Sequence, residues 1–248
     1  MRVLLLGGTT EAGHIALALA EAGVAGTFSY AGRTAMPVAQ PLPMRMGGFG
    51  SIDGLVEYLQ RGQITHVIDA THPFAVQISR NAVEACIQTA IPLIAYERAH
   101  WVAVAGDDWH HVSHTDAAVA VLPSEPARIF LAIGKQHLNP FAAQPQHFYL
   151  LRLVDAPAAT VPFPEAEVVL ARGPFTVEGD LELLRSRRIT HVVAKNAGGE
   201  AAKAKLDAAR ILGLPVIMID RPLLPERWTA TSVREIMCWL HHSADLGV

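Results

Sequence analysis

The chain has 248 residues, of which 51% are hydrophobic, and a formal net charge of -3 with a pI near 6.4. The weak negative charge argues against nucleic acid as the main ligand, because nucleic-acid binding normally requires a basic face. No uninterrupted apolar stretch approaches the roughly 18 residues of a membrane span, and Cys86 and Cys238 are isolated. We therefore expect a cytoplasmic protein with no membrane partner and no disulfide framework.

The first half of the chain predicts an alternation of strands and helices. Short continuous apolar runs followed by turn residues are typical of buried parallel strands. The expected strands are residues 3–6, 26–30, 44–46, 66–70 and 92–96, and the expected helices are residues 11–22, 52–60 and 76–89. Crossover connections of this length are typical of a doubly wound sheet.

The second half predicts the same alternation. Its expected strands are residues 128–133, 148–151, 168–171, 191–194 and 215–219, and its expected helices are residues 177–185 and 200–212. The capping box Ser232-Val233-Arg234-Glu235 predicts the start of a last helix. Residues 99–127 form a connector with a further expected strand at 110–112, so we expect two domains, 1–98 and 99–248.

Three segments of the first half recur in the same order in the second half. The matched pairs are residues 2–8 with 128–134, residues 61–68 with 187–193, and residues 91–94 with 214–217. Matched strand signals in one order predict two similar Rossmann-like α/β domains, each with a doubly wound parallel sheet, and a cleft between them. His66 and His191 are equivalent in this repeat, which favours a shared structural role over catalysis.

Gly7-Gly8-Thr9-Thr10 follows the first expected strand and opens the first expected helix. The start of a helix provides unpaired N–H groups and the positive end of the helix dipole, which suit a pyrophosphate. Thr9 and Thr10 could donate hydroxyl groups to a ligand or cap the helix. Because the segment is not the G-x-G-x-x-G fingerprint, a tight turn without a ligand is the alternative.

Arg33 follows the second expected strand, where an NAD-binding domain usually carries an acidic residue. A guanidinium group binds phosphate well, so Arg33 favours NADPH over NADH, with a solvated surface arginine as the alternative. The third strand-end, residues 69–75, is expected beside the nicotinamide half of the cofactor. In it, Asp69 is a candidate turn anchor, and His72 is a candidate for either a structural or a functional role.

Four segments together resemble the precorrin-6A reductase family of cobalamin biosynthesis, namely residues 7–11, 31–34, 47–50 and 69–75. The resemblance continues in residues 78–82, 96–98, 172–175 and 195–198 and in Trp101, so it spans nearly the whole chain. The segment at 69–75 is its most specific part. The resemblance implies transfer of hydride from NADPH to a ring-D double bond of the tetrapyrrole precorrin-6A, which gives precorrin-6B.

The strand-end positions and the resemblance together imply roles for individual residues. The expected cofactor-binding residues are Gly7, Gly8, Thr9, Thr10, Glu11, Gly32, Arg33, Ala70, Thr71, His72, Pro73 and Phe74. The expected substrate-binding residues are Ser79, Lys135, Arg152, Arg172, Gly173, Lys195 and Asn196. Cationic and amide groups suit a substrate that carries many carboxylates. His72 and Lys195 are the candidate proton donors, with another titratable group or bound water as the alternatives.

Other classes of function fit the sequence less well. His110-His111-x-x-His114 has no Cys cluster or H-E-x-x-H motif beside it, so we expect no metal site. A two-domain glycosyltransferase and a non-enzymatic NADPH sensor would also use Rossmann-like halves, but Arg33 and the segment around His72 favour the reductase. The oligomeric state, exchange of strands between the halves and a cobalt-containing substrate stay open. Contact with neighbouring enzymes of the pathway is a further expectation.

Overall fold

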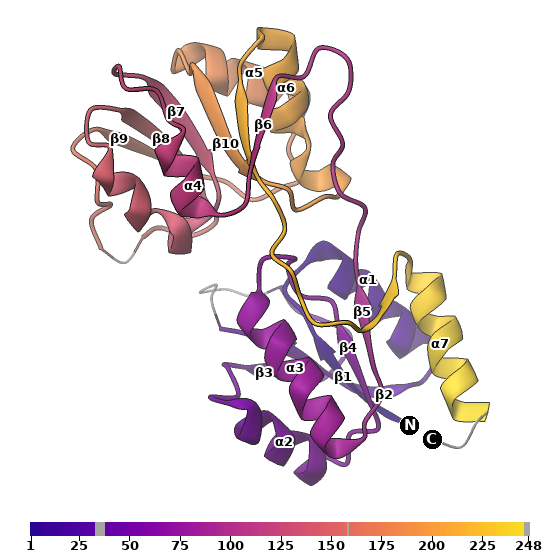
Figure 1. Cartoon of the computed structure of the whole chain (residues 1–248). Helices are drawn as coiled ribbons and strands as arrows, with labels where there is room; N and C mark the ends of the chain where they lie inside the picture. The colour runs from indigo at the N-terminus through magenta and orange to yellow at the C-terminus, as the bar shows by residue number, and fades with distance from the viewer. Residues whose placement is uncertain (33–37, 158, 246–248) are drawn as a thin grey trace. The chain divides into compact units, whose positions relative to one another are not determined.

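The computed structural model describes residues 1–32, 38–157 and 159–245, with side chains to residue 242 (Figure 1). The chain divides into two compact units. The first unit comprises Met1–Arg98 together with Leu223–Val248, and the second comprises Ala99–Pro222. None of the described helices combines the length and the hydrophobicity that crossing a bilayer requires.

The first unit contains a six-stranded sheet in which every pair of neighbouring strands is parallel. The strand order is β12-β5-β4-β1-β2-β3. The strands are β1 (Arg2–Leu6), β2 (Ala25–Tyr30), β3 (Met44–Met46), β4 (His66–Asp69), β5 (Leu93–Tyr96) and β12 (Trp228–Ala230). With β12 as the sixth strand, this is the order of the doubly wound dinucleotide-binding fold.

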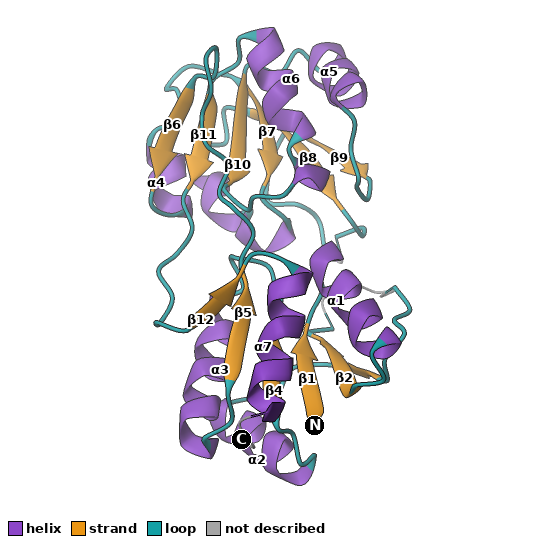
Figure 2. Ribbon diagram, turned by 90° about the vertical axis from the view of Figure 1, so that its right-hand side faces the viewer, coloured by secondary structure: helices purple, strands orange, loops and turns teal. Residues whose placement is uncertain are grey.

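Helices cover both faces of this sheet (Figure 2). On one face, Val3 and Leu5 of β1 pack with α1 (Thr10–Glu21) and α7 (Val233–Asp245). On the other face, Leu4 and Leu6 pack with α2 (Ile52–Arg61) and α3 (Val76–Thr89). Burial on both faces explains why this strand is a continuous apolar run rather than an alternating one.

The second unit repeats the topology with the order β6-β11-β10-β7-β8-β9, again with parallel pairs only. Its strands are β6 (Trp109–Val112), β7 (Arg128–Ala132), β8 (Phe148–Leu153), β9 (Ala166–Leu170), β10 (His191–Lys195) and β11 (Val216–Ile219). Its helices are α4 (Thr115–Ala120), α5 (Val177–Ser186) and α6 (Ala204–Leu212), with short 3-10 turns η1 (Lys135–His137), η2 (Asn139–Ala143) and η3 (Glu200–Ala202). The predicted fold class of two similar parallel-sheet α/β units is confirmed, although the expected helix at 200–212 is divided into η3 and α6.

The two sheets exchange their sixth strands. β6 follows β5 of the first unit along the chain, but it pairs with β11 of the second. β12 follows β11 and pairs with β5 of the first unit. The expected placement of residues 223–248 in the second domain is therefore corrected, because Ala230, Ile236 and Leu240 are buried in the core of the first unit.

The internal repeat is visible in matching hydrogen bonds at the start of β4 and β10. Thr65 Oγ1 accepts from Arg2 N at 2.9 Å, and Thr190 Oγ1 accepts from Arg128 N at 3.1 Å. In each case the same oxygen lies 2.9 Å from Nδ1 of the histidine that follows, His66 or His191. These contacts tie β4 to β1 in the first unit and β10 to β7 in the second, and they give the two histidines the shared structural role expected for them.

Acid should destabilise the protein through His66. Its side chain is only 1% exposed, and burial, followed by the positive N-terminus, lowers its pKa below 6.5. Between the folded pKa and pH 6.5, His66 is therefore largely protonated in the unfolded chain but largely neutral in the folded protein. The stability due to neutral His66 is complete above pH 6.5 and is lost as the pH falls toward the folded pKa.

We expect His66→Gln to reduce the slope of unfolding free energy against pH below neutrality, by at most about 1.4 kcal/mol per pH unit. Urea denaturation between pH 5 and 7 measures this slope. His14→Gln is the matched control, because His14 is exposed on α1. Equal slopes in His66→Gln and the unsubstituted protein would contradict the expectation.

Candidate functional site

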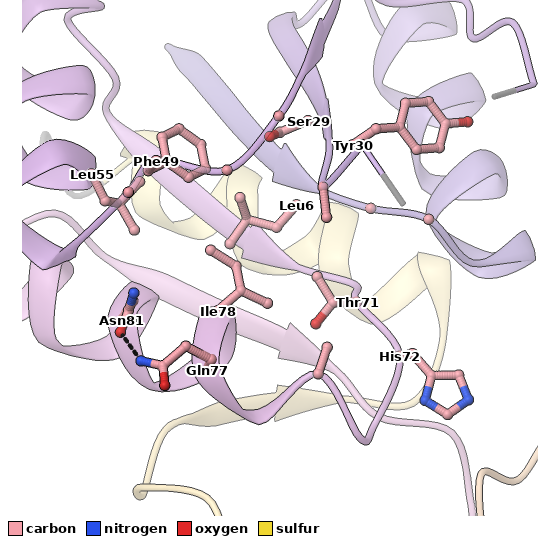
Figure 3. A pocket seen from close by; sticks show the side chains of 18 of the residues that line it. Leu6, Ser29, Tyr30, Phe49, Leu55, Thr71, His72, Gln77, Ile78 and Asn81 are labelled. Carbon is pink, nitrogen blue, oxygen red and sulfur yellow. Dashed lines mark hydrogen bonds between the residues drawn. The ribbon is translucent and has the colours of Figure 1, made fainter. Parts of the chain in front are cut away.

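A pocket of about 350 Å³ lies at the carboxyl edge of the first sheet (Figure 3). Its lining comes from the ends of β1 and β2, from the segments that follow β1, β2, β3 and β4, and from the N-terminal parts of α2 and α3. The lining residues are Leu6, Gly7, Gly8, Ser29, Tyr30, Ala31, Gly32, Gly47, Gly48, Phe49, Gly50, Ser51, Leu55, Thr71, His72, Ala75, Gln77, Ile78 and Asn81. The chain leaves β1 toward β2 on one side, while β4 pairs on the other, so this is the switch point where such sheets bind ligands.

Gly7 and Gly8 allow the backbone to approach this pocket closely. A Cβ atom at Gly7 would lie 2.2 Å from the Phe28 ring, so a larger residue does not fit there. Gly8 has φ +121°, a conformation that favours glycine, and a Cβ atom there would meet nothing within 4 Å. A ligand at the start of α1 could therefore contact the backbone directly.

Thr9 connects the first loop of the pocket to the loop after β4. Its hydroxyl accepts from Ala12 N at 3.1 Å, as the N-cap of α1, and donates to Ala70 O at 2.8 Å. The hydroxyl hydrogen is therefore used within the protein. Of the two roles open for Thr9, the structure assigns the cap, while Thr10 is the exposed first residue of α1.

Glu11 does not line the pocket, although it lies in the first turn of α1. Its Oε1 accepts from Arg98 Nη1 at 3.0 Å, and both side chains are largely buried. This ion pair ties the end of the segment that follows β5 to α1. Gly32 lines the pocket, whereas Arg33 lies outside the described residues.

Asp69 shapes the loop that follows β4. Its Oδ1 accepts from Thr71 N at 3.1 Å and from Thr71 Oγ1 at 2.7 Å, and its side chain is buried. Thr71 Oγ1 also lies 3.4 Å from Ser79 Oγ, which is buried beneath it in α3. Asp69 is therefore a turn anchor. Ser79 supports the pocket residue Thr71, and its expected contact with the substrate stays a prediction.

His72 lies at the rim of the pocket, at the opposite end from Phe49 and Leu55 (Figure 3). Its Nδ1 accepts from Phe74 N at 3.2 Å, so the neutral ring carries its hydrogen on Nε2. Protonation of Nδ1 would break this contact. Pro73 and Phe74 complete the turn without lining the pocket, and Ala70 is buried behind it.

Two groups of pocket residues received no role from the sequence. Residues 47–51 form one wall, and Gln77 and Asn81 of α3 form part of another, with Gln77 Nε2 donating to Asn81 Oδ1 at 2.7 Å (Figure 3). The glycines at 47, 48 and 50 were a usable signal, because they follow a strand as Gly7 and Gly8 do. Gln77 and Asn81 are separated by one helical turn, so they lie on one face of α3. The sequence alone does not show that this face points toward a site.

Arg45 of β3 holds the wall formed by residues 47–51. Its Nη1 donates to Ser29 Oγ and to Gly47 O, both at 2.8 Å, and its Nη2 donates to Gly48 O at 3.1 Å. The guanidinium carbon lies 3.9 Å from the centre of the Phe49 ring. One side chain thus connects the ends of β2 and β3 at the pocket.

In the second unit, several of the expected substrate residues lie at the carboxyl ends of the strands. Lys135 is exposed in η1, directly after β7. Arg172 and Gly173 are exposed in the loop after β9. Lys195 is the last residue of β10 and is 8% exposed.

Two other expected substrate residues are used inside the second unit. Arg152 forms an ion pair with Asp180 of α5, and both side chains are less than 10% exposed. Asn196 is buried, and both of its amide atoms bind the backbone of Trp101. Both side chains therefore have partners within the second unit, and their assignment to the substrate stays a prediction.

The histidines considered for a metal serve other contacts. His111 Nδ1 lies 2.7 Å from Asp220 Oδ1, and His114 Nδ1 accepts from Ala117 N as the N-cap of α4. Within the part of the chain that the structure describes, no group of three His, Cys, Asp or Glu side chains is arranged to hold a metal ion.

Comparison with known proteins identifies the family. The family model described as "Precorrin-6x reductase CbiJ/CobK" matches residues 2–241. The chain belongs to this family. It is 62% identical to a precorrin-6A reductase of Rhodobacter capsulatus, over 100% of this chain and 99% of the relative. It is also 43% identical to a precorrin-6A reductase of Rhodococcus erythropolis, over 96% of this chain and 97% of the relative.

A solved structure of this reductase family has the same fold. The structure described as "CobK precorrin-6A reductase" is 63% identical and has a TM-score of 0.94, with 98% of this chain and 96% of that chain covered. The chain is thus a reductase-family enzyme, and membership sets aside both the glycosyltransferase and the non-enzymatic sensor. Membership of a reductase family is consistent with a nicotinamide cofactor, and Gly8 leaves open space at the start of α1.

We expect Arg45→Ala to weaken binding of a reduced nicotinamide nucleotide about tenfold, because the wall at residues 47–51 loses its hydrogen bonds. A fluorescence titration measures the affinity. Arg61→Ala is the matched control, since the ion pair that Arg61 makes among the described residues is with Glu57 on the exposed surface of α2. Equal affinities of the two variants, with circular dichroism showing both folded, would remove Arg45 from the pocket's support.

Proposed function

We propose that this chain is a cytoplasmic precorrin-6A reductase of cobalamin biosynthesis. NADPH supplies hydride for a ring-D double bond of precorrin-6A, and a proton completes the reduction to precorrin-6B. The observation that carries the proposal is the 62% identity to the precorrin-6A reductase of R. capsulatus, which extends over 100% of this chain. The pocket at the switch point of the first sheet supports it.

The first unit is the proposed holder of NADPH. Gly7, Gly8 and the first turn of α1 suit the pyrophosphate, because they offer backbone N–H groups and the positive end of a helix dipole. The apolar side chains of Leu6, Phe49 and Ile78 line the same pocket and would exclude water from the cofactor.

The second unit is the proposed holder of the tetrapyrrole. Lys135 and Arg172 are exposed cations at the carboxyl ends of its strands, and Lys195 ends β10. Such groups suit the acetate and propionate side chains of a precorrin. Gly173, next to Arg172, keeps the backbone of that loop accessible.

His72 and Lys195 are the proposed candidates for the proton. The contact from Phe74 N to His72 Nδ1 is compatible with neutral His72 donating a hydrogen bond from Nε2. Acting as an acid would require the imidazolium form, which loses that contact.

Precorrin-6A without cobalt is the proposed substrate. The relatives named precorrin-6A reductase are 40–62% identical to this chain, whereas the cobalt-precorrin-6A reductase of Priestia megaterium is 30% identical. Reduction of the cobalt form is the alternative outcome of the same assay.

Turnover of the purified protein tests the proposal. We expect NADPH oxidation that depends on precorrin-6A, together with a product that has gained two hydrogens by mass spectrometry. Cobalt-precorrin-6A and NADH, each substituted in turn, are the comparison reactions. Absence of NADPH oxidation with either tetrapyrrole would contradict the proposed function.

The cofactor preference is assigned to Arg33, which follows the pocket residue Gly32 in the chain. We expect Arg33→Ala to weaken NADPH binding by about 1–3 kcal/mol, the scale of a lost charge-assisted contact, and to leave NADH binding nearly unchanged. Isothermal titration with each nucleotide measures both affinities. An equal loss of affinity for NADPH and NADH would show that Arg33 does not bind the phosphate that distinguishes NADPH from NADH.

A further inference from the structure

Asn196 binds a residue of the segment that leads from the first unit into the second. Trp101 N donates to Asn196 Oδ1 at 2.9 Å, and Asn196 Nδ2 donates to Trp101 O at 3.0 Å. The side chain thus makes the pair of bonds that a neighbouring strand would make. Asn196 directly follows Lys195, so this pair of hydrogen bonds fixes the chain where β10 ends.

The Trp101 ring holds the other end of the same turn. Its Nε1 donates to Gly199 O at 3.0 Å, and the ring is 7% exposed in the core of the second unit. Lys205 Nζ lies 4.7 Å from the ring centre, which adds a cation–π contact. Trp101 therefore contacts both Asn196 and Gly199, the two ends of a four-residue turn.

Arg221 and the backbone shape of Gly198 complete the support. Arg221 Nε donates to Asn196 O at 2.9 Å, and its Nη2 donates to Ala197 O at 3.0 Å. Gly198 has φ +68°, and a Cβ atom there would lie 2.1 Å from Ala99 O. The carbonyl groups of residues 196, 197 and 199 are thus all bound within the second unit.

We propose that Trp101 is a positioning residue for the tetrapyrrole substrate, which it serves by fixing the turn from Asn196 to Gly199 beside Lys195. The inference rests on the proposed function, in which Lys195 meets the substrate. Trp101 itself is buried, so its proposed role is to hold the turn and not to contact the substrate. Its effect is on where β10 ends and on how rigidly Lys195 and the turn are held.

Two substitutions separate this role from simple packing. Trp101→Phe keeps the hydrogen bonds between Asn196 and the backbone of residue 101 and most of the buried ring, but it removes the hydrogen bond to Gly199 O. Asn196→Asp keeps the size of the side chain, but it places an oxygen where Nδ2 donates to Trp101 O. Trp109→Phe is the matched control, because Trp109 packs on the same core and its Nε1 has no hydrogen-bond partner among the described residues.

Steady-state kinetics with precorrin-6A and NADPH test the proposal. We expect Trp101→Phe and Asn196→Asp to raise KM for precorrin-6A about tenfold, the scale of one lost buried hydrogen bond, with the NADPH dissociation constant within about twofold. Trp109→Phe should leave both constants unchanged. An unaltered KM for precorrin-6A in Trp101→Phe, measured beside an active unsubstituted enzyme, would overturn the inference. An equal loss of affinity for precorrin-6A and for NADPH would also overturn it. An unsubstituted enzyme without turnover would instead overturn the proposed function, and this inference with it.

Discussion

The hydrogen bond from Thr9 Oγ1 to Ala70 O holds together the two loops that border the switch point of the first sheet. The same hydroxyl caps α1, so one side chain sets both the start of the helix and its distance from the end of β4. Asp69 then fixes the turn that carries Thr71 and His72. The pocket depends on these short-range bonds, because parallel strands only bring the loops to one edge and do not determine their shape.

The two units combine one topology with different chemical groups at the ends of their strands. In the first, β1 leads through Gly7 and Gly8 into a 12-residue helix, whose first turn is open to an anion. In the second, β7 leads into the 3-10 turn η1, which presents Lys135. A long helix with its dipole suits a nucleotide, whereas separate cations at strand ends suit a ligand with several carboxylates.

Much of the fold was predictable because burial on both faces leaves apolar runs that mark the strands. Because the two halves of the sequence share a repeat, the topology expected for the first unit could also be expected for the second. The place of β12 was not predictable, because a strand of three residues takes its partner from tertiary contacts such as those of Ile236 and Leu240. In the candidate sites, Gly7, Gly8, Thr71 and His72 followed from strand ends. The internal contacts of Arg152 and Asn196 were not predictable, because a strand-end position does not say which protein groups a side chain meets.

We propose that the nicotinamide nucleotide binds in the first unit, between the Gly7-Gly8 turn and the loop at Thr71. A crystal structure of the protein with NADPH tests it most directly. We expect density for the nucleotide in contact with Gly8 and Thr71, with the phosphate groups at the start of α1. Density for the nucleotide at the strand ends of the second unit, beside Lys135 or Lys195, would contradict it.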